Sequence, residues 1–328
     1  MIPYTALHRE LKRIYQDNGL FRRPGWPTYL EFVNNWLPPE FLRMLAEVEG
    51  GIQTPEVTAT LETAYTVFVI GKAGNPSYRI STELIRALRD TDIPAFPIDQ
   101  LRTPFEGLVI TVPVGTFARP AHTVDTIFVS SIPGARFRVV FYTENGYTNY
   151  ISILNDGVKT ILEAIATTEE ADVCAIPEEM RAAAEKAKIY ENYFRTDIFR
   201  FAVNFALYVT CPDADVYQDK SAIRKLHEKL QGVKGKRRRG ILLSKLVAAK
   251  EQSKIFIVGA NVRLQKEYTA DLTESGKRWV LKHRLRVQGH WKMVVCGAQR
   301  KERVRRWISP HFRGPTYAEM VEKGYVVK

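Results

Sequence analysis

The sequence predicts an α+β fold: an antiparallel sheet flanked by helices, followed by a basic, β-rich C-terminal segment. Three observations support this prediction. Helical patterns fill most of the first ninety residues, short β-branched and aromatic segments follow between residues 108 and 154, and helical patterns then return. Excess positive charge is confined to the last third of the chain. With 328 residues, 45% of them hydrophobic, the chain can form one large or two modest cores.

The N-terminal helices are separated by clear boundary signals. Asn18-Gly19 is typical of a helix end, and proline opens two segments where its missing N–H leaves no bond unmade. Ser81 or Thr82 serves as an N-cap, with Glu83 near the first turn. Helices are therefore expected over residues 6–19, 27–36, 38–51, 54–72 and 81–92.

The sheet is predicted from short segments rich in Val, Ile, Phe and Thr. Asn145-Gly146 lies between two of them and is the strongest local signal for a two-residue hairpin turn. We therefore expect an antiparallel meander from about Leu108 to Leu154, with strands near residues 107–113, 125–132, 136–143 and 148–154.

Further helices are expected over residues 157–171, 177–194 and 196–211, and the last is apolar on nearly every side, which predicts a buried central helix. From Lys220 to Lys254 the chain is polar and basic, which favours a loop or a mobile connection, and residues 253–264 then resemble a strand. We therefore divide the chain into an α+β domain (1–219), a basic linker or helical connection (220–253) and a basic β-rich segment (254–328). Whether the C-terminal strands join the central sheet is left open.

The distribution of charge indicates an anionic partner. The formal net charge is +12, but residues 1–170 carry 15 Lys and Arg against 19 Asp and Glu, and residues 171–219 carry 5 against 9. Residues 220–328 carry 28 against 8. Such segregation favours a surface for phosphates or for an acidic protein, whereas a basic domain that is merely soluble is the simpler alternative.

Several functional classes lack their motifs. Cys174, Cys211 and Cys296 are widely spaced, which argues for reduced thiols in a cytoplasm and against a disulfide scaffold or zinc ribbon. The N-terminus has no signal-like apolar core and no apolar run reaches membrane-spanning length, so we expect no membrane partner. Nucleotide-binding, serine-hydrolase and metal motifs are absent as well, so no cofactor and no metal are expected.

The C-terminal stretch from Lys282 to Pro315 is dense in arginine, histidine and tryptophan. Residues 278–291 and 303–314 both alternate, so two strands joined by the loop "VCGAQRKE" would form a hairpin with a cationic face. Such a face can hold RNA or DNA through phosphate pairing and through stacking on Trp291, Trp307 or Phe312. The alternative is that the tryptophans belong to the core. We favour that alternative for Trp279 and Trp307, while Trp291 fits either.

Two other functions stay open. A metal-free ribonuclease would use His290 or His311 as general acid or base. A DNA-binding regulator would use the basic segment "GVKGKRRRG".

The segment "KHRLRVQGHWKMVVCGAQRKERVRRWISPHF" resembles the C-terminal signature of the second type V-A anti-CRISPR family. The matching positions are His283, Arg286, Gly289, His290, Trp291, Arg305 or Arg306, Trp307 and Pro310.

The resemblance implies a binding protein from a phage or another mobile element, which we do not expect to be an enzyme, that recognises the nascent N-terminal peptide of an RNA-guided nuclease. Loss of the translated mRNA would then lower the amount of nuclease, with the ribosome or the mRNA as a second partner. A basic nascent peptide would suit acidic positions such as Glu169, Glu170, Asp172 and Asp213. The candidate peptide- or nucleic-acid-binding residues are His283, Arg284, Arg286, His290, Trp291, Arg305, Arg306, Trp307, His311 and Arg313, with a basic loop of Lys234, Lys236, Arg237, Arg238 and Arg239.

Overall fold

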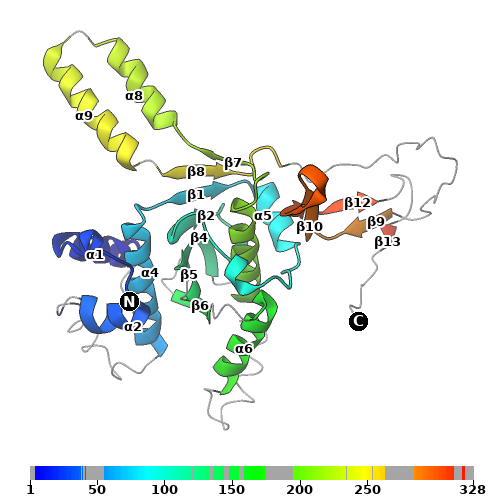
Figure 1. The fold of residues 1–328 in the computed structure, drawn as a ribbon. Helices are drawn as coiled ribbons and strands as arrows, with labels where there is room; N and C mark the ends of the chain where they lie inside the picture. Colours follow the sequence, from blue (N-terminus) through cyan, green and yellow to red (C-terminus); the bar gives the residue numbers. More distant parts are fainter. Residues whose placement is uncertain are drawn as a thin grey trace.

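The protein, seen in a computed structural model, has an α+β fold, as the sequence predicts. Helices lie on both sides of a mixed eight-stranded sheet (Figure 1). The residues that the structure describes are 4–37, 39, 41, 55–119, 122–132, 136–143, 148–154, 159–174, 195–233, 235–252, 254–262, 284–313 and 320–321.

The central sheet has the strand order β6-β5-β4-β2-β1-β8-β7, and β3 pairs with β4. The antiparallel meander is confirmed by the pairing of β2 with β4, β4 with β5, and β5 with β6. The turn expected at Asn145-Gly146 lies outside the described residues. The strands are β1 (Ser77–Ile80), β2 (Gly107–Thr111), β3 (Phe117–Arg119), β4 (His122–Ser131), β5 (Arg136–Thr143), β6 (Thr148–Leu154), β7 (Val216–Gln218) and β8 (Ile255–Val258).

The sheet is mixed because of β1, and the sequence pattern predicts neither this strand nor β7. β1 has four residues and pairs in parallel with both β2 and β8, and β7 has three residues and pairs with β8. The predicted antiparallel pairing holds across the meander, and the parallel pairs of β1 were not predicted. β8 joins the central sheet, whereas the later strands form two small sheets of their own.

Two helical layers enclose the sheet. On one face lies α4 (Pro55–Lys72), which packs in turn against α1 (Tyr4–Asp17), α2 (Tyr29–Glu31) and the π-helical turn Phe32–Trp36. The other face carries α5 (Thr82–Arg89) and the helical residues 195–209, while α6 (Ile161–Cys174) contacts β6 (Figure 1).

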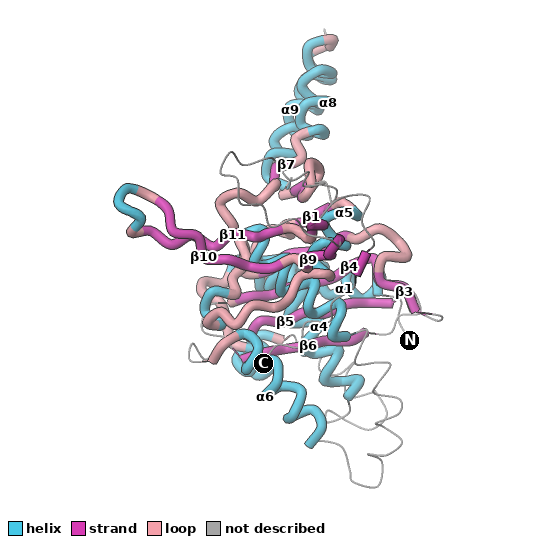
Figure 2. Tube along the Cα trace, turned by 90° about the vertical axis from the view of Figure 1, so that its right-hand side faces the viewer, coloured by secondary structure: helices cyan, strands magenta, loops and turns pink. Residues whose placement is uncertain are grey.

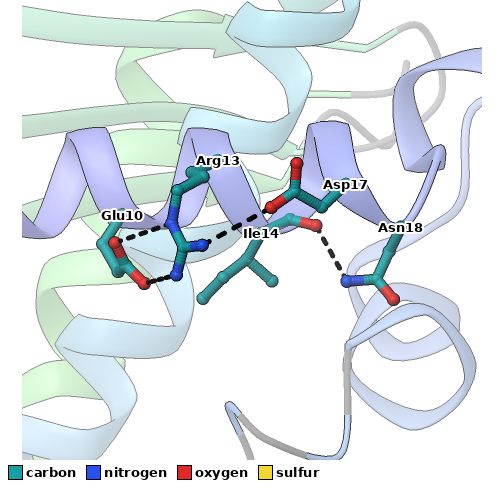
Figure 3. A network of polar contacts seen from close by, with 5 residues as sticks. All are labelled: Glu10, Arg13, Ile14, Asp17 and Asn18. Atoms are coloured by element: carbon teal, nitrogen blue, oxygen red, sulfur yellow. Dashed lines mark hydrogen bonds and ion pairs between the residues drawn. The ribbon is translucent and has the colours of Figure 1, made fainter.

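The predicted helix signals are largely confirmed. Ser81 caps α5 by accepting the Leu84 N–H at 3.2 Å, and Gly19 ends α1 with a φ of 63°. Residues 198, 199 and 201–208 are buried on nearly every side of their helix, as expected, and Arg200 is exposed. The solvent side of α1 carries the ion pairs of Arg13 with Glu10 and Asp17 (Figure 3). The helix expected over residues 177–194, and nearly all of that over 38–51, lie outside the described residues.

Of the two alternatives for residues 220–253, a basic linker and a helical connection, the structure shows the helical one, as a pair of helices. α8 spans Ser221–Gln231 and α9 spans Lys236–Gln252, and together they project from the sheet (Figures 1 and 2). The loop prediction failed because the charge run masked apolar residues that recur at helical spacing. Within the described parts of the chain, no helix combines the length and apolarity needed to cross a membrane.

A buried ion pair joins α4 to the sheet. Glu62 accepts a hydrogen bond from Nε of Arg138 on β5 at 2.7 Å, and both side chains are almost fully buried. The Arg138 guanidinium also lies 4.7 Å from the centre of the Tyr65 ring and 5.2 Å from that of Tyr29. Burial raises the pKa of Glu62, and the neighbouring Arg138 opposes that shift. The contact fixes how α4 lies on the meander.

Replacing Arg138 by Met should lower the free energy of unfolding by about 3–5 kcal/mol, because Glu62 would remain buried without its cation. The double variant Glu62→Leu, Arg138→Met should regain most of this loss, since it removes both charges. Urea unfolding of the three proteins measures the difference. Equal losses in the single and double variants would contradict an essential ion pair.

Candidate binding surface of the C-terminal hairpin

The C-terminal strands form a hairpin and a second small sheet. The hairpin pairs β10 (His290–Cys296) with β11 (Glu302–Ile308) through the 3₁₀ turn Ala298–Arg300. β9 (Arg284–Val287) pairs with β12 (His311–Arg313) and with β13 (Met320–Val321). A hairpin around the predicted loop is confirmed, but its first strand is His290–Cys296. Of residues 278–291, which were expected to form that strand, residues 284–287 belong to β9 of the other small sheet and residues 278–283 lie outside the described residues.

The break before this strand lies at Gly289. A Cβ atom at Gly289 would lie 2.2 Å from Oγ1 of Thr91 and 3.0 Å from Cδ of Pro310. The Gly289 carbonyl also accepts the Asp92 N–H at 3.2 Å. Only glycine permits this close approach. The chain passes at this point from β9 into β10, the first strand of the hairpin.

Trp291 attaches β10 to the core. Its Nε1–H donates to Oδ1 of Asn204 at 2.9 Å, and the Asn204 amide donates to the carbonyls of Leu88 at 3.1 Å and Thr91 at 2.8 Å. Asn204 is fully buried in the helix of residues 195–209. A buried amide needs such partners, so Asn204 joins the central helix, the end of α5 and the hairpin.

Trp307 attaches β11 at the position directly opposite Trp291. Its Nε1–H donates to Oγ1 of Thr91 at 3.1 Å, and that hydroxyl donates to the Ala87 carbonyl at 2.7 Å. The ring meets Tyr208 edge-on, with centroids 5.2 Å apart. Trp307 is therefore a packing residue, as the favoured interpretation of the sequence expected. Trp291 is attached to the core in the same way, through its N–H group.

Arg305 completes the attachment from the same face of β11. Its Nη2 donates to the Leu207 carbonyl at 3.1 Å and to Oγ1 of Thr210 at 2.6 Å. The guanidinium thus satisfies a carbonyl at the C-terminal end of a helix, where a cation is electrostatically favoured. Nearby, burial raises the pKa of the Cys211 thiol, which donates to the Leu207 carbonyl at 3.3 Å.

The outer part of the hairpin is exposed and projects from the body (Figure 2). Met293 and Val295 of β10 are 38% and 46% exposed and share a face with Arg303 and Arg305. Lys292 and Arg306 are exposed on the opposite face, where Nε of Arg306 lies 3.9 Å from a carboxylate oxygen of Asp213. The free surface is therefore cationic with two apolar side chains.

The remaining candidates are dispersed. Arg286 forms an ion pair with Asp90 on the body. His290 and His311 lie on different small sheets, and their Nδ1 atoms face the carbonyls of Gln288 at 3.2 Å and Ser309 at 3.0 Å. Arg284 lies on β9 and Arg313 on β12. His283 and Lys234 lie outside the described residues. The remaining candidates are exposed at the start of α9: Lys236, Arg237, Arg238 and Arg239.

Four residues that shape this surface were not predicted from the sequence: Thr91, Asn204, Met293 and Val295. Asn204 had a usable signal, because it is the one amide in the otherwise apolar stretch from Phe201 to Val209. Across the described ranges, no group of three or more His, Cys, Asp or Glu side chains gathers as metal ligands would.

Trp291→Phe should lower the free energy of unfolding by about 1–3 kcal/mol, because the buried Asn204 oxygen loses its donor. Trp307→Phe should act in the same direction, through Thr91. Amide hydrogen exchange should accelerate first in β10 and β11. The exposed neighbour His290→Ala provides the control and should change stability by less than about 0.5 kcal/mol. A Trp291 variant as stable as this control would exclude the attachment described here.

Comparison with known proteins identifies relatives of the chain. The model of the AcrVA2-like family, described as the anti-CRISPR type V subtype A2 family, matches residues 78–312. A crystal structure of AcrVA2 is similar at 13% sequence identity, with a TM-score of 0.44, over 93% of this chain and 92% of that chain. No protein with a curated description matches.

Proposed function

Because the chain belongs to the AcrVA2-like family of type V subtype A2 anti-CRISPR proteins, we propose that it lowers the amount of a type V-A effector nuclease during the nuclease's synthesis. The protein binds the nascent N-terminal peptide of the effector, and the mRNA under translation is then lost. The family match over residues 78–312 is the observation that carries this proposal, since it spans the central sheet, the α8–α9 pair and the hairpin.

The outer hairpin is the surface that we assign to the peptide. Its two strands pair only with each other within the described residues, so each leaves one backbone edge for an added strand. An extended peptide gains affinity from main-chain hydrogen bonds and specificity from alternate side chains. Met293 and Val295 supply apolar contacts on one face, and Arg303 and Lys292 supply charge.

The attachment of the hairpin supports this assignment. The ring N–H groups of Trp291 and Trp307 donate to buried side chains of the core. Arg305 donates to a carbonyl at the C-terminal end of the central helix. Stacking of bases on these two rings, which the sequence suggested, would compete with those contacts. The tryptophans hold the hairpin in place, and its exposed end makes the contact.

Recognition of the peptide, and not of the RNA sequence, is the first test. In cells that express this protein, a reporter fused behind the first codons of the effector should lose both protein and mRNA. A matched reporter in which those codons are shifted by one frame keeps nearly the same RNA but encodes another peptide, and it should be spared. Equal loss of both mRNAs would favour recognition of RNA, including direct cleavage. The ribonuclease alternative predicts that purified protein cleaves the same RNA and that its His290→Ala, His311→Ala variant does not. Intact RNA with the unchanged protein, or cleavage by the variant, would exclude it.

The hairpin assignment makes a second prediction. Met293→Asp with Val295→Asp should weaken binding of the effector's N-terminal peptide by about tenfold or more, since two apolar contacts are lost. Leu30→Asp with Val114→Asp changes two apolar residues elsewhere that are even more exposed, and it should leave peptide affinity unchanged. Fluorescence anisotropy with a labelled synthetic peptide measures both. The hairpin is not the peptide surface if the two pairs behave alike.

A further inference from the structure

The helices α8 and α9 pack against each other and together form an arm, residues 220–252, that projects from the sheet. α8 packs along α9, and the less exposed apolar residues of the two helices recur at helical spacing, among them Leu226 and Leu230 on α8 and Leu242 and Leu246 on α9. Both views show the pair extending away from the sheet (Figures 1 and 2).

The root of the arm is fixed to the sheet. The chain enters the arm from β7 and leaves it into β8, and these strands pair from Val216 opposite Val258 to Gln218 opposite Phe256. At the entry, the Asp219 N–H donates to the Ile255 carbonyl at 2.7 Å, and the Asp219 carboxylate accepts the Ser221 N–H at 2.9 Å. The arm therefore holds a set orientation.

The arm is strongly cationic. Residues 220–252 contain eleven Lys and Arg against two Glu. Lys236, Arg237, Arg238 and Arg239 open α9 and are all exposed, and the first turn of that helix has no acidic residue. A helix N-terminus already carries partial positive charge, so four cations there disfavour the folded helix by a few tenths to about 1 kcal/mol each. Folding does not account for them, whereas a bound polyanion would reverse the sign of their contribution.

The distribution of these cations favours an RNA duplex. Consecutive helical residues project about 100° apart, so residues 236–239 surround the helix, which suits contact with phosphates on both sides of a groove and not with a flat membrane. Residues 220–252 also contain no Phe, Tyr or Trp, so the arm has no aromatic platform for single-stranded bases. Double-stranded RNA is bound largely through its backbone and shape.

We propose that the α8–α9 arm binds double-stranded RNA through its phosphate backbone, with Lys236, Arg237, Arg238 and Arg239 as the principal contacts. The choice of RNA over DNA rests on the proposed function, which places the protein at a translated mRNA and its ribosome. The arm thereby provides an RNA contact separate from the peptide surface of the hairpin.

The test compares two full-length variants with the same change in charge. One replaces residues 236–239 of the arm by Gln, and the control replaces Arg9, Arg22, Arg86 and Arg200, which are exposed on the body. The arm variant should bind a 20-base-pair RNA duplex about 100-fold more weakly or worse at about 0.15 M salt, and its slope of log affinity against log salt should fall by about three to four. The control should change affinity by less than about threefold.

Folding does not confound this result. Removing cations from the start of α9 should leave urea unfolding unchanged or shift it to higher urea, because their interaction with the helix dipole is unfavourable. Equal RNA affinity of the two variants would overturn the proposal. So would tighter binding to a DNA duplex of the same sequence, or selective loss of binding to phosphatidylserine vesicles.

The exposed apolar residues of α9 allow one more alternative, a second copy of the chain. Leu243 and Val247 are 46% and 55% exposed and one helical turn apart. If Leu243→Glu with Val247→Glu abolishes a dimer seen by sedimentation and removes RNA binding as fully as the arm variant does, the arm is a dimer interface and the proposal fails.

The proposed function is tested separately by the frame-shifted reporter. A wild-type protein that spares the in-frame reporter would refute that function without altering the duplex affinities. An arm variant that loses duplex RNA but still removes the reporter mRNA would confirm the binding site and exclude it from the mRNA loss.

Discussion

The hydrogen bonds of Asn204 are the constraint on which the C-terminal surface depends. The amide donates to Leu88 and Thr91 at the end of α5 and accepts from Trp291 of the hairpin, and it lies in the otherwise apolar stretch from Phe201 to Val209. An unbonded amide buried at this depth would cost a few kcal/mol, so the three elements are stable only in this mutual arrangement. Thr91 makes an equivalent contact, because its hydroxyl oxygen accepts the Nε1–H of Trp307. The inner half of the hairpin thus belongs to the core, and only its outer half is available to a partner.

Most of the Gly-His-Trp and Arg-Arg-Trp residues therefore attach the hairpin to the core and do not form the surface that is available to a partner. Gly289, Trp291, Arg305 and Trp307 all have packing or hydrogen-bonding roles that place the hairpin. Arg306, next to two of them in sequence, is exposed. Alternation along β11 separates these roles, because successive side chains point to opposite faces of a strand. A variant that changes Arg305, Arg306 and Trp307 together would therefore mix loss of attachment with loss of contact.

The sequence predicted what local signals encode and missed what depends on distant pairing. Cap and stop residues located α1 and α5, and β-branched alternation located the meander. β1 and β7 have too few residues to show a period, and β1 becomes a strand only through its parallel partners β2 and β8. The dense charge near Arg237 hid the helical spacing of α9. For the site, the hairpin and the packing of Trp307 were predictable from alternation, whereas the contacts of Trp291 depend on Asn204, 87 residues away.

The two proposed contacts are joined by one short pair of strands. β7 and β8 lead into the arm at one end, and at the other the segment before β7 carries Asp213, beside Arg306 of the hairpin, and Cys211, whose thiol donates to the Arg305 carbonyl at 3.6 Å. A rigid spacing between a peptide site and an RNA site makes the second binding event intramolecular, at a high effective concentration. Each site can then be weak alone, and tight binding arises only where the nascent peptide and structured RNA occur together. Under the proposed function, that condition would be met on a ribosome translating the target and would be lost once the finished nuclease is released.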